Sequence, residues 1–344
     1  MKRVTLLAML AACISVSAYG GVVTVTPLPA GASYGIAEYA NPLAGVIAEY
    51  DEENWRVSQP GSYFLELITS RSRKRETVSR LTSINPNWQA GDVAWVTFTT
   101  PQPIAVGTVI TSQYVWRDSA NDANNDYPMS YTLRLGSDGA DTDWSDIAPT
   151  LSGPGARSTN RIQLQTLDQV GLYDSIRLDG ATVPAPTQPH DITTCFVDFG
   201  QVIVLPERLE PIAVTGPAGL MDYDASSWAS GATTFTFAGL AAGQTQRVDA
   251  IVIWCVDNGS QTFTIRDGLG NALVSVDMQL DASGGYVLPL QFANPLYTDA
   301  ITLDFTAGGN ILFEIMFLTA VPEPATMSLL ALGGLALLRR RTRR

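Results

Sequence analysis

The chain contains 344 residues, of which 46% are apolar and 16% charged, and its formal net charge is −12. This acidic balance excludes a nucleic-acid partner, because phosphate contacts require a basic face. One histidine and three cysteines leave little material for histidine-based catalysis or for a cysteine and histidine metal site. The composition, with 29 glycines and 20 prolines, favours an exported β-protein.

The N-terminus has the three parts of a secretory signal. Lys2 and Arg3 precede an apolar run too short to span a bilayer, and small residues precede a cleavage point for signal peptidase after Ala18. We therefore expect a signal helix within residues 1–18. Cys13 leaves a second reading open, in which lipidation of this cysteine would tether the mature N-terminus.

Strand patterns dominate between residues 21 and 320, where we find no amphipathic helix longer than about two turns. β-branched and aromatic residues form the runs 93–98, 131–135, 251–254 and 263–265, and Gly, Asn, Asp and Pro punctuate the chain between them. Short strands at this spacing predict an all-β protein built from sandwiches.

An internal repeat divides this region. The tetrapeptides at 88–91 and 228–231 both begin with tryptophan, and four further matches follow in the same order. We therefore predict two tandem β-sandwich domains, at residues 21–205 and 212–320, joined by a linker at 206–211. The repeated tryptophans are expected in hydrophobic cores: Trp88, Trp116, Trp228 and Trp254.

The order of these elements loosely resembles the discoidin-type, galactose-binding-like jelly roll over residues 60–320. The likeness rests on an early tryptophan before a strand, a central strand that ends in tryptophan, a strand–turn–strand pair and a final strand of apolar and acidic residues. It implies jelly-roll domains of a kind that mostly bind glycans, lipids or proteins through loops at one end. A fold alone does not settle function.

An oxygen-rich segment at 118–126 is a candidate site for a structural Ca²⁺ ion, which takes carboxylate, amide and carbonyl ligands in flexible geometry. Asp118, Asp122 and Asp126 would supply the carboxylates. The segment lacks the spacing of an EF-hand and has no counterpart in the second half of the chain. A solvated loop without metal is therefore the alternative.

A basic cluster stands out in an otherwise acidic body: Arg71, Arg73, Lys74 and Arg75. Its side chains could contact an exopolysaccharide or another anionic envelope glycan through charge-assisted hydrogen bonds. A solvated loop is again the alternative. The unrepeated aromatic residues Trp55, Tyr127 and Trp144 are candidates for stacking on sugar rings.

No motif nominates a catalytic residue. His190 has no second histidine to support it, and no sequence pattern selects a pair of carboxylates. Cys195 and Cys255 fall in different predicted domains, which favours two buried thiols over a disulfide. We expect a non-enzymatic protein that associates with extracellular polysaccharide. A secreted polysaccharide hydrolase or lyase and a self-associating matrix protein are the alternatives.

The last 23 residues carry the most specific signal in the chain. The motif Pro322-Glu323-Pro324 precedes the uncharged run 325–338, and a terminal arginine cluster follows. A helix over this run is shorter than the hydrocarbon core, but flanking arginines can snorkel, so we expect a short transmembrane helix. The arginines fix its C-terminus in the cytoplasm, and they include Arg339, Arg340 and Arg341.

This tail resembles the PEP-CTERM sorting signal of Gram-negative bacteria, with the proline–glutamate–proline motif, the apolar helix and the arginines all present. The resemblance implies recognition by an exosortase at the membrane, removal of the helix and delivery to the cell surface or the extracellular space. A plain C-terminal anchor is the alternative. Without the two end segments, the body keeps 14 basic and 32 acidic residues and a formal charge of −18.

Overall fold

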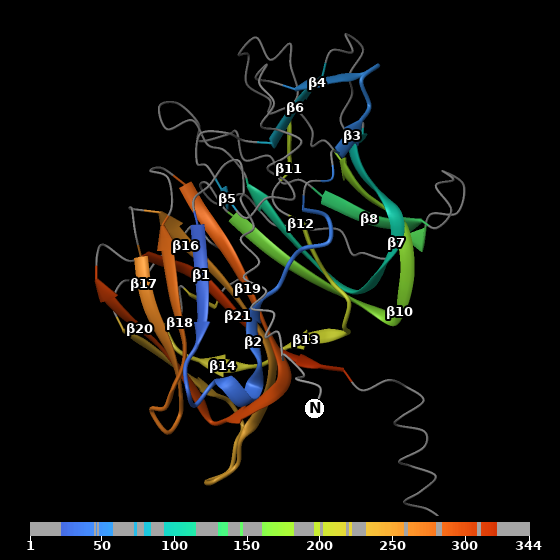
Figure 1. Ribbon diagram of the computed structural model, residues 1–344. Coiled ribbons are helices and arrows are strands. Elements are labelled where there is room, and N and C mark those ends of the chain that lie inside the picture. The colour runs from blue at the N-terminus through green and yellow to red at the C-terminus, as the bar shows by residue number, and fades with distance from the viewer. Residues whose placement is uncertain are drawn as a thin grey trace, which may run out of the picture.

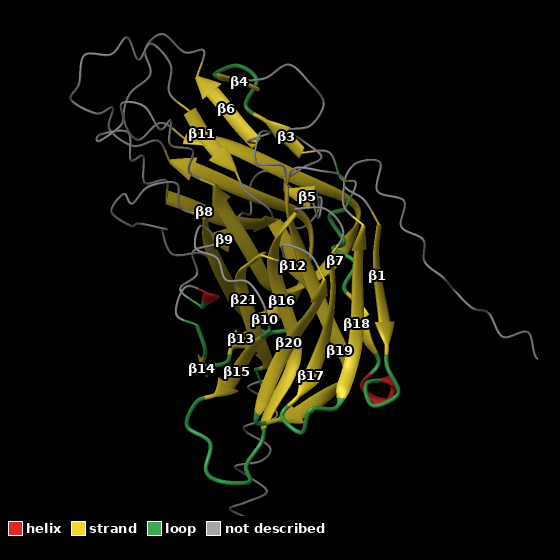
Figure 2. Ribbon diagram, turned by 90° about the vertical axis from the view of Figure 1, so that its left-hand side faces the viewer, coloured by secondary structure: helices red, strands yellow, loops and turns green. Residues whose placement is uncertain are grey.

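The computed structural model describes residues 22–44, 46, 48–57, 72–73, 79–83, 93–114, 130–136, 145–146, 160–181, 196–199, 202–217, 220–221, 232–257, 261–279, 284–307 and 311–321. This part of the chain is nearly all β-strand, which confirms the predicted fold class (Figure 2). The expected helices at 1–18 and 325–338 lie outside it. No helix among the described residues is long and apolar enough to cross a membrane.

Two antiparallel sheets form one sandwich, seen on the left of Figure 1, and enclose a large hydrophobic core. Alternating burial along β15 (Thr233–Phe237) shows why its sequence, TTFTF, forms such a strand: the phenylalanines face the core and threonines face outward. Sheet A contains, in order, β1 (Val22–Pro27), β18 (Ala272–Gln279), β17 (Gln261–Asp267), β20 (Ala300–Ala307), β15 and β14 (Val214–Thr215). Sheet B contains β13 (Leu209–Pro211), β21 (Ile311–Ala320), β16 (Gln246–Asp257), β19 (Gly284–Thr298) and β2 (Ile36–Glu38), and β5 (Ser72–Arg73) also pairs with β19. We call sheets A and B the second sandwich.

The first sandwich is built around sheet C, in which two 22-residue strands pair along most of their length. Register shifts between Thr166 and Gly171 and between Tyr173 and Ser175 divide this pairing into two halves, and residues of both halves share one core. Sheet C contains β12 (Val202–Leu205), β7 (Val93–Tyr114), β10 (Asn160–Ala181), β8 (Ser130–Gly136) and β9 (Ser145–Asp146), with β3 (Ala48–Tyr50) paired to β7. A three-stranded sheet D adds β11 (Phe196–Phe199), β6 (Ser79–Ser83) and β4 (Trp55–Val57), and the 3-10 turn η1 (Ala32–Tyr34) lies between β1 and β2.

The strand pairing of the two sandwiches follows the same plan. The first half of β7 pairs with the second half of β10, as β15 pairs with β20. The second half of β7 pairs with the first half of β10, as β16 pairs with β19. β12 then joins β7 as β21 joins β16. The pairing therefore repeats in the order in which the sequence matches repeat.

A third hydrophobic cluster, which we call the middle core, joins the two sandwiches. Along β12, Val202 and Val204 face the core of the first sandwich, whereas Ile203 and Leu205 face the middle core. Residues of β16 alternate in the same way, with Ile251 in the core of the second sandwich. These strands read as unbroken apolar runs because both of their faces are covered.

Trp254 confirms the expectation of burial, with 2% of its surface exposed, but it packs in the middle core rather than in the core of its own sandwich. Its partners there include Ile110 and Ile162 of the first sandwich. The other three repeated tryptophans lie outside the described residues. Because Trp254 is buried between the two sandwiches, their hydrophobic packing is continuous.

The N-terminal strands join the second sandwich, although the predicted boundaries place them in the first. All six residues of β1 pair with β18, and β2 pairs with β19 (Figure 1). Ile36 of β2 lies in the core of the second sandwich. In the predicted linker 206–211, β13 pairs with β21. The remaining domain boundaries stay predictions.

Candidate functional site

The C-terminal end of β21 is fixed on both sides. Leu209 and Glu210 of β13 pair with Ala320 and Thr319. One residue further, the backbone N–H of Val321 donates a 2.8 Å hydrogen bond to the carbonyl oxygen of Arg208. The folded body therefore continues to the residue immediately before Pro322, and we call this end of the second sandwich the tail end.

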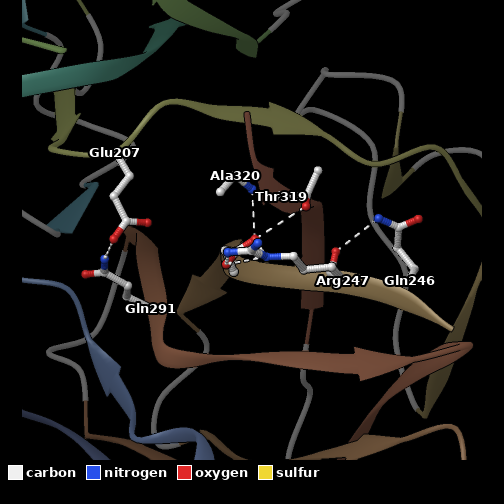
Figure 3. Close-up of polar contacts among 7 residues, drawn as sticks. Glu207, Gln246, Arg247, Gln291, Thr319 and Ala320 are labelled. Carbon is white, nitrogen blue, oxygen red and sulfur yellow. Dashed lines mark hydrogen bonds and ion pairs between the residues drawn. The ribbon is translucent and has the colours of Figure 1, made fainter. Parts of the chain in front are cut away.

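A buried carboxylate holds the other side of the same strand end. Asp249, whose side chain is 6% exposed, lies at a register shift in β16 between Val248 and Ala250. It accepts hydrogen bonds from the backbone N–H of Ala320 at 2.8 Å and from the hydroxyl of Thr319 at 3.4 Å (Figure 3). Bulges of this kind redirect a side chain, and here the carboxylate reaches the neighbouring strand.

Arg247 supplies the charge partner of this carboxylate. Its Nε lies 2.9 Å from Oδ2 of Asp249 and its Nη2 lies 2.8 Å from Oδ1, which is a two-point contact. The hydrogen bond to Asp249 raises the pKa of the Arg247 guanidinium above its usual value, although partial burial opposes this. The guanidinium thus keeps its charge and compensates the buried carboxylate.

The segment 206–208, between β12 and β13, is the connection between the sandwiches. Hydrogen bonds from the first sandwich hold it in place. The hydroxyl of Thr108 donates to the carbonyl of Glu207 at 2.8 Å and accepts from the N–H of Leu209 at 2.8 Å. The Nε of Arg208 donates to the carbonyl of Leu167 at 2.7 Å. Gly107 is required beside this connection, because a Cβ there would lie 2.4 Å from the backbone carbon of Glu207.

A partly open pocket of about 290 Å³ lies beside these contacts, at the junction of the two sandwiches. Val170 comes from β10, Arg208 from the connection, Arg247 from β16 and Pro295 from β19, and Val321 forms the edge where the tail begins. The site thus combines a paired carboxylate and guanidinium with a fixed chain end. Its hydrogen bonds attach the start of the tail at Ala320 and Val321 to β16 and to the segment between the sandwiches.

Glu207 adds a second carboxylate to this region. Its Oε1 accepts a hydrogen bond of 3.2 Å from the side-chain amide of Gln291 (Figure 3). Burial, followed by the negative charge of Glu207, raises the pKa of the Tyr39 hydroxyl above its usual value. Tyr39 packs against the middle core, so it stays neutral there.

Most of the sequence-predicted site residues lie outside the described ranges. These are Ala18, Arg71, Lys74, Arg75, Asp118, Asp122, Asp126, Tyr127, Trp144, His190, Cys195, Pro322, Glu323, Pro324, Arg339, Arg340 and Arg341. Arg73 is placed by its backbone in β5, opposite Gly285 of β19. Trp55 and Cys255 are likewise placed only as positions in β4 and β16. Within the described ranges, no group of three His, Cys, Asp or Glu residues could hold a metal ion.

Sequence reasoning missed the contacts of Asp249 and Arg208 with the strand end. Both residues lie far from residue 320 along the chain, and neither belongs to a motif. The sequence Arg247-Val248-Asp249 interrupts an apolar strand with two charges, and this interruption was the one available signal.

Residues 320–344 match the family model of the PEP-CTERM protein-sorting motif. The chain therefore carries a PEP-CTERM sorting tail, which implies an exported protein that is anchored transiently in the membrane and processed by an exosortase. The match covers the tail and not the body. No curated protein matches the chain.

Similar solved structures include a fucolectin from the serum of the striped bass Morone saxatilis, with 11% identity, a TM-score of 0.31, and coverage of 83% of this chain and 99% of that chain. Another is chitosan-binding module 1 of a chitosanase/glucanase from Paenibacillus sp. IK-5, with 17% identity, a TM-score of 0.31, and coverage of 48% and 99%. A third is CpGH89CBM32-6 of Clostridium perfringens, with 11% identity, a TM-score of 0.28, and coverage of 48% and 98%.

Proposed function

We propose that this protein is a non-enzymatic component of the cell surface or extracellular matrix, delivered by an exosortase and associated with exopolysaccharide. The observation that carries the delivery step is the sorting tail at residues 320–344, attached directly to a folded body. Signal peptidase removes the N-terminal segment after Ala18. The tail then holds the body at the outer face of the inner membrane until the exosortase acts.

The backbone position of Arg73, the one described residue of the basic cluster, fits an association with an anionic glycan. Arg73 of β5 pairs with Gly285, near the start of β19. The neighbouring residue Gly284 pairs with Asp257, the last residue of β16. This end of sheet B is opposite the tail end. A glycan bound by the cluster would therefore meet the body on the side away from the membrane anchor.

Deletion of residues 322–344 tests the delivery step. We expect the shortened protein to accumulate in the periplasm or medium without the mass change that accompanies processing. Glu323→Gln is the narrower variant, because it alters the motif and leaves the apolar run and the arginines in place. Unchanged localisation and unchanged processed mass in the deletion variant would refute sorting by the tail.

Glycan association is tested on the processed protein recovered from the cell surface. Replacement of Arg71, Arg73, Lys74 and Arg75 by glutamine should release it from a column of the organism's own exopolysaccharide at lower salt than the parent. Arg157→Gln removes a basic residue outside the cluster and serves as the control. Equal elution of the fourfold variant and the parent would eliminate the cluster as the contact.

A further inference from the structure

Exposed apolar side chains gather at the tail end. Among the described residues, five large hydrophobic side chains are exposed, and four of them are Leu269 at 88%, Leu172 at 65%, Tyr297 at 56% and Val170 at 42%. Single exposed side chains of this kind are common on soluble proteins. Four of the five lie at the end of the body from which the membrane anchor continues, and this placement calls for a physical cause.

Strand pairing and contacts place these four residues at the same end of the body as the last residue of β21. Val170 and Val321 line the same pocket, and Leu172 lies two residues further along β10. Tyr297 pairs directly with Arg247. The next residue of β19, Thr298, accepts a 2.9 Å hydrogen bond through its hydroxyl from the N–H of Gly268, in the turn that carries Leu269.

The turn at 268–271 holds Leu269 outward. One carboxylate oxygen of Asp267 accepts the backbone N–H of Leu269 at 3.0 Å and that of Asn271 at 2.8 Å. Gly270 has a φ of +81°, which closes the turn and favours glycine. The leucine therefore stands at the tip of a hydrogen-bonded turn, where a soluble protein usually has a polar residue.

The length of chain after Val321 limits how far the bilayer can be. Three residues, Pro322 to Pro324, separate Val321 from the uncharged run that begins at Ala325. Even a fully extended chain covers at most about 3.6 Å per residue, so the run begins within roughly 14 Å of Val321. Anchoring by the tail therefore brings the tail end to the membrane surface.

We propose that the tail end is a membrane-contact surface, on which the anchored protein rests against zwitterionic lipid headgroups before processing. This inference rests on the proposed function, because the tail must first insert. Leu269, Leu172 and Tyr297 enter the boundary between headgroups and acyl chains, where a tyrosine hydroxyl stays hydrated while its ring is buried.

The charged residues at the tail end determine whether the proposed contact needs anionic or zwitterionic lipid. At this end, Glu207, Asp267 and Asp299 lie beside Arg208, Arg247 and Arg266, so these described residues give no excess of positive charge. Contact consequently depends on apolar insertion and does not need anionic lipid. This contact also holds the sorting motif at the membrane surface, within reach of the membrane-embedded exosortase.

Hydrogen–deuterium exchange on the full chain tests the proposal, with the protein reconstituted through its tail into phosphatidylcholine vesicles. We expect slower exchange in peptides covering 166–175, 266–272 and 293–299 than in the same chain held in detergent. Peptides covering 261–264 and 276–279, at the end of the hairpin away from the turn, and the buried strand 250–254 should show no change. Adding anionic lipid should not increase the protection.

Replacement of Leu172, Leu269 and Tyr297 by serine should abolish this protection while co-sedimentation with vesicles persists through the tail. A protein that is anchored but unprotected at the tail end would overturn the membrane contact and leave sorting intact. Protection that survives in the serine variant would overturn the role of the apolar side chains. Protection that appears without lipid as protein concentration rises would assign the surface to a second copy of the chain. Loss of co-sedimentation in the parent would instead contradict anchoring itself.

Discussion

The carboxylate of Asp249 accepts a 2.8 Å hydrogen bond from the backbone N–H of Ala320, two residues before the sorting motif. The same carboxylate is paired with Arg247, so one buried charge ties the start of β16 to the end of β21. The end of β21 is thus part of the hydrogen-bond network of the body.

Asp249→Ala should lower the free energy of unfolding by about 1–3 kcal/mol, because it leaves the N–H of Ala320 unpaired and removes a charge-assisted contact. Asp304→Ala is the matched control, since Asp304 forms a more exposed pair with Arg266 and should cost only about 0–1 kcal/mol. Urea denaturation of both variants measures the difference. Equal losses would show that the contact with Ala320 is not stabilising.

Trp254 provides a test of the middle core. Trp254→Ala should cost about 3–5 kcal/mol because it opens a cavity between the sandwiches. The indole Nε1 has no hydrogen-bond partner among the described residues, so Trp254→Phe loses packing alone and should cost about 1–2 kcal/mol. We expect the parent to melt in one transition by calorimetry. Separate transitions in the parent would contradict coupling through this core.

The N-terminal strands can be tested by truncation. A mature chain that begins at residue 40 lacks β1 and β2, so it exposes the edges of β18 and β19 and removes Ile36 from the core. Full burial of such a side chain contributes about 1.5–3 kcal/mol. We expect lower thermal stability and aggregation by light scattering, because unpaired edges recruit other chains. A chain beginning at residue 22 should behave as the parent does.

The raised pKa of Tyr39 predicts that the free energy of unfolding falls at alkaline pH. Its pKa in the folded protein is raised above the ordinary value of 10.0 by burial, so the unfolded chain loses this proton first as pH rises. Stability should therefore be unaffected below about pH 10 and should fall above it. Tyr39→Phe should flatten the decline in the urea midpoint between pH 10 and 12. An identical decline in this variant would assign the effect to other groups.

Local sequence patterns were sufficient for the fold class and for the tail, because alternation, turn residues and the proline–glutamate–proline motif are short-range signals. They could not identify the partners of β1, which pairs with residues about 250 positions away. The alternation of residues 22–27 indicates a strand but carries no information about its neighbour. Likewise, the run at 251–254 shows burial, and only the assembled sheets show that Trp254 faces the other sandwich.

The contact between Asp249 and Ala320 could not be predicted for a related reason. A register shift between Val248 and Ala250 turns the carboxylate toward β21, and such shifts depend on how two strands meet. The exposed leucine at 269 is visible in the sequence as an apolar residue within a turn. Its closeness to the tail follows from the hydrogen bond between Gly268 and Thr298.

The pairing of β21 with both β13 and β16 also determines how the body withstands mechanical load. A pull on the tail acts along β21, perpendicular to the ladder hydrogen bonds on its two sides. Those bonds must then yield together in shear instead of opening one after another as in a zipper. Fluid drag on an anchored molecule is therefore transmitted into the centre of sheet B, and the terminal strand resists being peeled away.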